Sequence, residues 1–433
     1  MPLTTTGLVR SARLLSLPAG TAALAAEGAV RRLAGQDRER VAQDLRERNA
    51  ARTRRVLGGL KGGALKAGQL LSNVEALFPQ DPEQTWRESL AGLQEGNAPL
   101  PFADVEPVLR AELGEHWRDE LPGFEESATA AASIGQVHRA RSADGRPVAV
   151  KVQYPGVREA LTADVRTVSL MSRAAALVAR GLALPPLVAE LRERLVEELD
   201  YLHEGAVQTR FAQAYAGDPD VLVPRVHRAT SRVLIMDWVD GTPLSAVART
   251  GTQAERDRAA SLYQRFLVSG PARAGLLHTD PHPGNFRLLP DGRLGVLDFG
   301  STLELPTMPT TFGRLIGALL GDDPGEVLRR LREEGFVRPG VEVDVDKLVD
   351  YMSPFTVPAR YERFRFTRDW LRCEFARVND PRNPEFGGAL TLDLPAEHLF
   401  THRVWLGMVG VLCQLEAEVE VRPVLEEFMP GFA

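Results

Sequence analysis

The chain has 433 residues, of which 44% are hydrophobic and 25% are charged, as is ordinary for a globular protein with a substantial core. Its formal net charge of −6 argues against a nucleic-acid partner, because phosphate binding usually depends on an excess of lysine and arginine. The two cysteines, Cys373 and Cys413, argue against a disulfide framework or a zinc site, and no apolar run reaches the ~18 to 20 residues of a membrane span.

The first 125 residues have a mainly helical pattern, and their beginning has two alternative interpretations. Arg10 and Arg13 precede a mildly apolar run at 14–26 that resembles a secretory signal, although Pro18 interrupts its apolar part. The stretch at 8–24 either packs in the core as a helix or contacts a membrane peripherally. We favour the core helix and expect a cytoplasmic protein.

A second helical stretch at about 56–77 is rich in glycine. It places Lys66 and Gln69, which are three residues apart, on one helical face. Its glycines would let another backbone approach closely at a functional site. The alternative is that they serve close packing alone.

The pattern next predicts a β-hairpin with a lysine on its second strand. The run at 146–152 alternates, with three valines on one face and Lys151 on the other, as in a half-buried strand. Asp144 and Gly145 form a turn signal, so 136–141 should be the antiparallel partner. Lys151 either faces solvent or points toward bound phosphates.

An alanine-rich loop precedes this hairpin and includes Ala130, Ala131, Ala132 and Ser133. Small residues let backbone amides approach phosphate, but alanine has poor access to positive φ. We therefore expect a loop that is stiffer than a glycine-rich one.

An acidic helix is predicted at 187–215, after two prolines. Carboxylates recur in it every three or four positions, at Glu193, Glu197, Asp200 and Glu204. Such a stripe is usually a solvated face, but one of its carboxylates could instead hold Lys151 in place.

The segment at 278–285, His-Thr-Asp-Pro-His-Pro-Gly-Asn, has the spacing of a kinase catalytic loop between Asp280 and Asn285. Asp298 begins an Asp-Phe-Gly triplet. Phosphoryl transfer needs a carboxylate that orients or deprotonates the acceptor and oxygen ligands for magnesium, and these three residues supply both.

The surroundings of this segment argue against a transition-metal site. His278 and His282 are four residues apart, but the prolines between and beside them break a helix, so His278 is expected to buttress the loop. The loop continues into a predicted hairpin, in which 286–289 and 293–297 flank the turn signal Pro290-Asp291-Gly292.

Together these motifs resemble the UbiB family of atypical kinases, also called the AarF or ADCK family. The resemblance covers about residues 57–301, and it rests on Lys66-x-Gly68-Gln69, the alanine-rich loop, the Val-Ala-Val-Lys strand, Glu198-x-Asp200 and the two downstream motifs. It implies an α+β, two-lobed protein kinase-like fold. Its parts would be an N-terminal helical extension at 1–125 packed over the nucleotide cleft, an N-lobe at 126–240 and a mainly helical C-lobe at 241–433.

The resemblance also implies roles for individual residues. The catalytic residues would be Asp280, Lys151 and its partner Glu204, and the magnesium ligands would be Asn285 and Asp298. The nucleotide would be bound by Lys151, by the loop residues Ala130, Ala131, Ala132 and Ser133, and by the hinge residues Met236, Asp237 and Val239. The regulatory residues would be Lys66 and Gln69 together with Glu198 and Asp200, which would be the acidic partners of Lys66.

Three functions follow as alternatives. The first is an ATP- and Mg²⁺-dependent phosphotransferase or ATPase with a small-molecule or lipid acceptor in isoprenoid-quinone or lipid metabolism, as the resemblance implies. The second is a nucleotide-binding pseudokinase that regulates partners. The third, a conventional protein kinase, is disfavoured by the alanine-rich loop and by a helix that would occupy the space of a protein substrate.

Overall fold

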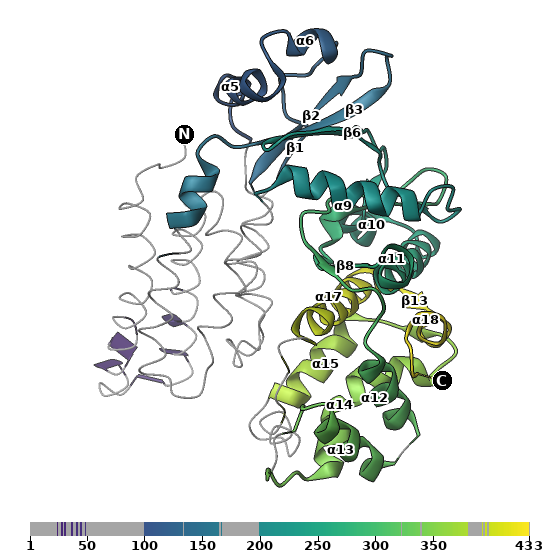
Figure 1. The fold of residues 1–433 in the computed structure, drawn as a ribbon. Coiled ribbons are helices and arrows are strands. Elements are labelled where there is room, and N and C mark those ends of the chain that lie inside the picture. The colour runs from purple at the N-terminus through teal and green to yellow at the C-terminus, as the bar shows by residue number, and fades with distance from the viewer. Residues whose placement is uncertain are drawn as a thin grey trace. The chain divides into compact units, whose positions relative to one another are not determined.

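The computed structural model describes residues 99–132, 134–163, 199–321, 323–337, 340–379 and 398–432, with scattered positions at 24–48, 166, 392 and 395 (Figure 1). The chain divides into two compact units. The first comprises Met1–Gly205 and Val226–Trp238, and the second comprises Ala206–Arg225 and Val239–Ala433. The division at 125 and 240 stays a prediction.

Among the described residues of the first unit, the main feature is an antiparallel sheet (Figure 1). Its strands, in spatial order, are β1 (Ala130–Ala131), β2 (Gly135–Arg141), β3 (Pro147–Gln153), β6 (Val233–Asp237) and β5 (Val226–Ala229). The helices α5 (Phe102–Leu113) and α6 (Trp117–Glu120) belong wholly to this unit, and residues 157–163 are helical as well.

The predicted hairpin around Lys151 is confirmed. β2 and β3 pair from Gly135 opposite Gln153 to Arg141 opposite Pro147. Gly145 has a φ of 85°, a conformation that glycine adopts without strain. The register therefore follows from a turn that was visible in the sequence.

The prediction that this strand is half-buried is wrong, because β3 is buried on both faces after Pro147. α5 contacts β3 and β6, and its Val105, Val108 and Leu109 share one core with the β3 valines. The valine face is the one that was expected to be buried. The opposite face carries Lys151, which donates to Glu204 at 2.7 Å, and Gln153, which donates to the Leu199 carbonyl at 2.9 Å. The strand pattern by itself carries no information about these distant partners, so the burial of the second face could not be predicted from it.

The predicted helix at 187–215 is wrong in its continuity. α9 (Tyr201–Ala214) begins only at Tyr201, and Leu199 and Asp200 are not helical. Asp200 caps the helix, since its Oδ1 accepts from the backbone N–H groups of Leu202 at 3.0 Å and His203 at 3.2 Å. Asp200 and Glu204 therefore do not share one helical face.

The second unit is mainly helical. Its described helices are α10 (Leu244–Thr250), α11 (Gln253–Ala274), α12 (Thr310–Leu320), α13 (Pro324–Glu333), α14 (Val345–Arg360), α15 (Arg368–Asn379), α17 (Leu399–Leu415) and α18 (Arg422–Phe428). A short 3-10 turn, η2 (Pro283–Asn285), lies among them in the sequence.

Short strands connect these helices. They are β4 (Val221–Leu222), β7 (Thr242–Pro243), β8 (Leu276–His278), β9 (Phe286–Leu288), β10 (Leu294–Val296), β11 (Thr302–Glu304), β12 (Phe364–Arg365) and β13 (Glu418–Val419). They pair in the orders β4-β10-β9-β7, β11-β8 and β12-β13. The predicted hairpin after Asn285 is confirmed as β9 and β10.

α11 is the central helix of this unit's core. It begins at a capping box, in which the Thr252 hydroxyl accepts from the Glu255 N–H while Glu255 accepts from the Thr252 N–H. It contacts β8, α17 and α18, and twelve of its residues are buried. Within the described part of the chain, none of the helices combines the length and apolar character that crossing a membrane requires.

Candidate active site

The first unit holds a buried ion pair. Lys151 on β3 donates to Glu204 Oε1 in the first full turn of α9 at 2.7 Å, and the two side chains are only 7% and 2% exposed. The pairing of Lys151 with Glu204, which the family resemblance implied, is therefore present. The strand fixes one partner and the helix fixes the other, so the ammonium has little freedom.

An aromatic ring completes the surroundings of Lys151. The ammonium lies 5.0 Å from the ring centroid of Tyr201, which is fully buried. Gly135 makes room for this tyrosine, since a Cβ there would come within 2.9 Å of the Tyr201 hydroxyl and 2.3 Å of the Val152 carbonyl oxygen. The sequence analysis missed Tyr201; its position directly after the Glu-x-Asp motif was the available signal.

The alanine-rich loop forms the edge of the same sheet. Ala130 and Ala131 lie in β1 and are exposed, and the Ala132 N–H donates to the Gly135 carbonyl at 2.8 Å. Ser133 lies outside the described residues. The loop thus closes against the start of β2, with its alanine side chains accessible.

The predicted hinge follows β6. Met236 is buried and pairs with Ala149 on one side and Val226 on the other, and the Asp237 carboxylate lies 2.7 Å from His227 Nε2. Val239 is the first residue of the segment assigned to the second unit and is also buried. The Met236 backbone is thus paired with the strands on both sides of β6.

The second unit brings Asp280 and Asn285 together. Asn285 Nδ2 donates to the Asp280 carboxylate at 3.1 Å and to its carbonyl at 3.3 Å, across the turn η2. His282 Nδ1 accepts from the Gly284 N–H at 3.1 Å and stabilises the turn. Because the amide nitrogen is used in this contact, the Asn285 side-chain oxygen is the atom suited to a cation.

The hairpin β9–β10 carries Asp298 to the same end of the sheet. Phe286 pairs with Val296, and the next step of the ladder is a bond from the Leu297 N–H to the Asn285 carbonyl at 2.9 Å. Asp298 follows directly, and its Oδ1 accepts from the Gly300 N–H at 3.0 Å. An amide oxygen and a half-buried carboxylate are hard ligands that fit Mg²⁺.

His278 connects the two motifs. It is fully buried, and its Nε2 donates to the Asp298 carbonyl at 2.6 Å. Burial lowers the pKa of the imidazole, against a smaller opposing effect of the Asp298 carbonyl and of the charges on Asp280 and Asp298. The neutral ring therefore acts as a structural donor, as expected from the sequence.

Arg287 is a further residue that the sequence analysis missed. It follows Phe286 on β9, and its guanidinium donates to the Gly241 carbonyl at 2.8 Å. Burial lowers its pKa, and the charge of Asp240 opposes this. Arg287 thus joins the strand after Asn285 to the segment that follows the predicted hinge.

Three of the predicted regulatory residues, Lys66, Gln69 and Glu198, lie outside the described residues. The fourth, Asp200, is exposed and is the cap of α9. The pairing of Asp200 with Lys66 stays a prediction.

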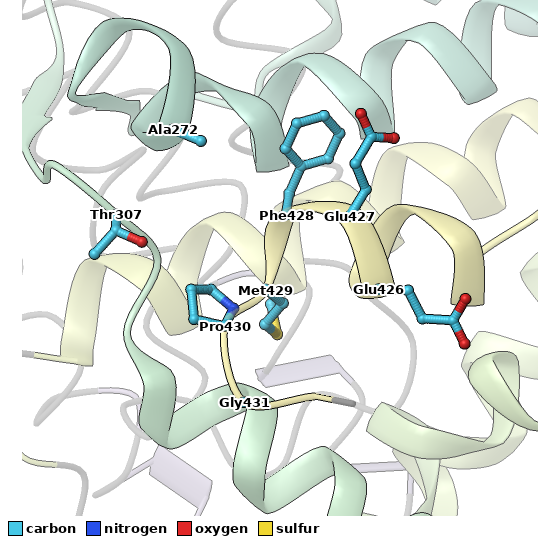
Figure 2. Close-up of a pocket in the computed structure, with 8 residues that line it drawn as sticks. All are labelled: Ala272, Thr307, Glu426, Glu427, Phe428, Met429, Pro430 and Gly431. Carbon is cyan, nitrogen blue, oxygen red and sulfur yellow. The ribbon is translucent and has the colours of Figure 1, made fainter.

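A hollow of about 220 Å³ in the second unit has none of these predicted residues in its lining (Figure 2). It is lined by Ala272, Thr307, Glu426, Glu427, Phe428, Met429, Pro430 and Gly431. Its two carboxylates already have partners, Glu426 with Arg422 and Glu427 with Arg265, each at 2.8 Å. Nothing in its lining indicates a ligand.

Comparison with known proteins decides the family. A family model described as ABC1 atypical kinase-like domain matches residues 92–328, which is more than half of the chain. The chain belongs to this family. The ABC1 match includes Lys151, Glu204, Asp280, Asn285 and Asp298, and the resemblance to UbiB kinases is thereby confirmed.

Individual relatives agree with the ABC1 assignment. Protein ACTIVITY OF BC1 COMPLEX KINASE 1, chloroplastic, of Arabidopsis thaliana is 32% identical over 68% of this chain and 44% of its own length. Atypical kinase COQ8, mitochondrial, of Saccharomyces cerevisiae is 31% identical over 60% of this chain and 51% of its own length. The chain thus spans about half the length of these curated relatives.

A solved structure supports the fold. Rv3197 from Mycobacterium tuberculosis, determined in complex with erythromycin, is 38% identical, with a TM-score of 0.71 over 92% of this chain and all of that one. The chain is an α+β protein with the kinase-like ABC1 fold.

Proposed function

We propose that this ABC1-family chain is an ATP- and Mg²⁺-dependent enzyme that transfers a phosphoryl group to a small-molecule or lipid acceptor or hydrolyses ATP. Lys151, Asp280, Asn285 and Asp298 would serve one nucleotide. The pathway we propose is isoprenoid-quinone or related lipid metabolism, which is supported by the names of the COQ8 relatives.

The observation that carries the proposal is the buried pair of Lys151 and Glu204. Removing an ammonium and a carboxylate from water costs several kcal/mol each, and their attraction rarely gives a net gain over apolar side chains. Such a pair is therefore weak as a stabilising device. A lysine held at a fixed position by a carboxylate is, however, what the binding of nucleotide phosphates needs.

The residues of the second unit supply the remaining chemistry. Asp280 would accept a hydrogen bond from the attacking hydroxyl or water and take its proton, and Asn285 keeps the carboxylate oriented through the 3.1 Å contact. Asn285 and Asp298 would hold Mg²⁺ by their oxygens. Bound Mg²⁺ would neutralise charge on the phosphates.

The test is ATP turnover with Mg²⁺ by the intact chain, with and without quinone precursors and lipids. We expect Asp280→Asn to retain nucleotide binding and to lose turnover, and Asp298→Asn to lose both. Asp291→Asn, an exposed carboxylate in the β9–β10 turn that pairs with Arg293, is the matched control and should behave as wild type.

Two outcomes would contradict the proposal. Wild-type protein that binds nucleotide without turnover under every condition would favour a regulatory pseudokinase. Turnover that survives in Asp280→Asn would exclude Asp280 as the base.

A further inference from the structure

Pro281, which follows Asp280, is held by two helices of the second unit. The buried Tyr263 of α11 donates its hydroxyl to the Pro281 carbonyl at 2.6 Å. Gly407 of α17 lies against the proline ring, and a Cβ on Gly407 would come within 2.4 Å of Pro281 Cγ. Real Cβ atoms do not approach so closely, so glycine is required unless the proline moves.

Tyr263 also contacts the other end of the loop. Its ring meets that of Phe286 edge to face, with centroids 4.8 Å apart and an interplanar angle of 89°. Phe286 directly follows Asn285. The Tyr263 side chain therefore contacts both the residue after Asp280 and the residue after Asn285. Asp280 and Asn285 are themselves joined by the 3.1 Å hydrogen bond between their side chains.

The Tyr263 hydroxyl is important because the loop segment around Pro281 has few backbone N–H donors. Pro281 and Pro283 have no N–H, and a buried carbonyl without a donor is costly. Burial raises the pKa of Tyr263 well above its ordinary value, and the charge of Asp280 adds to this. The phenol therefore stays protonated and able to donate.

We propose that Tyr263 and Gly407 form a clamp on Pro281 that sets the positions of Asp280 and Asn285 for phosphoryl transfer. The inference rests on the proposed function of Asp280. Tyr263 and Gly407 are positioning residues in it, because they act through Pro281 and Phe286 and not on the substrate.

The same core offers matched controls. Tyr215 is also buried, and its hydroxyl makes one hydrogen bond, with Ser269 Oγ at 2.8 Å, away from the loop. Gly410 lies on the same helix as Gly407, and a Cβ there would meet nothing within 4 Å. Tyr→Phe and Gly→Ala can therefore each be made once at the clamp and once outside it.

The first experiment measures steady-state kinetics with Mg-ATP. We expect kcat to fall about tenfold or more in Tyr263→Phe and Gly407→Ala, because small displacements of reacting groups are costly to rate. KM for ATP should change by less than about threefold, since neither Lys151 nor Asp298, the residues proposed to bind the phosphates and the cation, belongs to the clamp. Tyr215→Phe and Gly410→Ala should keep the wild-type kcat. Equal losses of kcat in clamp and control variants would overturn the proposal.

The second experiment does not depend on turnover. Amide hydrogen exchange of peptides covering 279–289, without nucleotide, should be about fivefold faster in Tyr263→Phe than in Tyr215→Phe, as expected for one lost hydrogen bond. Equal exchange would refute the clamp even if the enzyme is active. A wild-type protein without turnover would refute the proposed function, and exchange would still decide whether the clamp exists. If Gly407→Ala does not fold, Tyr263→Phe decides alone.

Discussion

At the scale of single residues, Lys151 and Glu204 form an ion pair in the interior of the first unit. Both groups are buried, so the loss of one partner leaves the other charge in a low-dielectric environment. The Tyr201 ring face provides the ammonium with one additional attraction, which is weaker than the carboxylate.

We predict that Glu204→Gln lowers the free energy of unfolding by about 3 kcal/mol. Glu304→Gln, which breaks the exposed pair with Arg210, should cost less than about 1 kcal/mol. The double variant Lys151→Met with Glu204→Leu should be more stable than Glu204→Gln, because it leaves neither charge of the pair buried. Urea unfolding measures all three, and equal losses in Glu204→Gln and Glu304→Gln would contradict the argument.

His278 makes stability dependent on pH. Its pKa is lowered in the folded protein, so below about pH 6.5 the unfolded chain binds more protons than the folded one. This contribution to stability is complete above about pH 6.5 and is lost as the pH falls toward the folded pKa.

We therefore predict that Tm falls less between about pH 7 and about pH 5 in His278→Gln than in wild type. Glutamine keeps a nitrogen donor for the Asp298 carbonyl but does not titrate in this range. His116→Gln removes a side chain that is 93% exposed and should leave the wild-type slope. The same slope in all three proteins would show that His278 does not control acid stability.

At the scale of elements, α9 owes its start to Asp200. The side chain accepts from two backbone N–H groups that otherwise have no partner within the helix. The same residue is predicted to pair with Lys66, which would depend on its charge.

The two roles respond differently to substitution. We predict that Asp200→Ala costs about 1 kcal/mol of unfolding free energy, whereas Asp200→Asn costs only a few tenths, since asparagine is an equally good cap. Asp323→Ala, at the cap of α13, should cost about as much as Asp200→Ala. If Asp200→Asn is as destabilising as Asp200→Ala, the carboxylate charge and not the cap is what the protein uses.

The same element marks the limit of prediction from sequence. The two hairpins were predicted correctly because their signals, Asp144-Gly145 and Asp291-Gly292, are local. The start of α9 was missed because the spacing of acidic residues across Asp200 outweighed its capping signal. Helix periodicity does not reveal a break that a side chain creates by bonding to the backbone.

The contacts of Tyr263 were beyond prediction for another reason. A tyrosine on an amphipathic helix predicts only a core position, and its partners Pro281 and Phe286 lie about twenty residues away in the sequence. Gly407, more than a hundred residues further, has no local feature that connects it with Pro281. Motifs therefore predicted which side chains are candidates for the site. The packing that positions these side chains became visible only in the folded chain.

At the scale of the whole molecule, the residues proposed for one reaction belong to both units. Lys151 and Glu204 are in the first, and Asp280, Asn285 and Asp298 are in the second. If all serve one nucleotide, a substitution in either unit must weaken the same binding event. A ligand that binds only the folded protein also stabilises it, so binding can be measured as stability.

We predict that Mg-ATP at about 100 times its Kd stabilises the wild-type chain by about 2.7 kcal/mol, and that Tm rises accordingly. Lys151→Met and Asp298→Asn should each remove most of this rise, although they lie in different units, because the phosphates need the ammonium and the bound cation together. Asp291→Asn should retain the full rise. A rise that is lost in Lys151→Met but unchanged in Asp298→Asn would mean that the second unit does not take part in nucleotide binding, and the proposed division of roles would then be wrong.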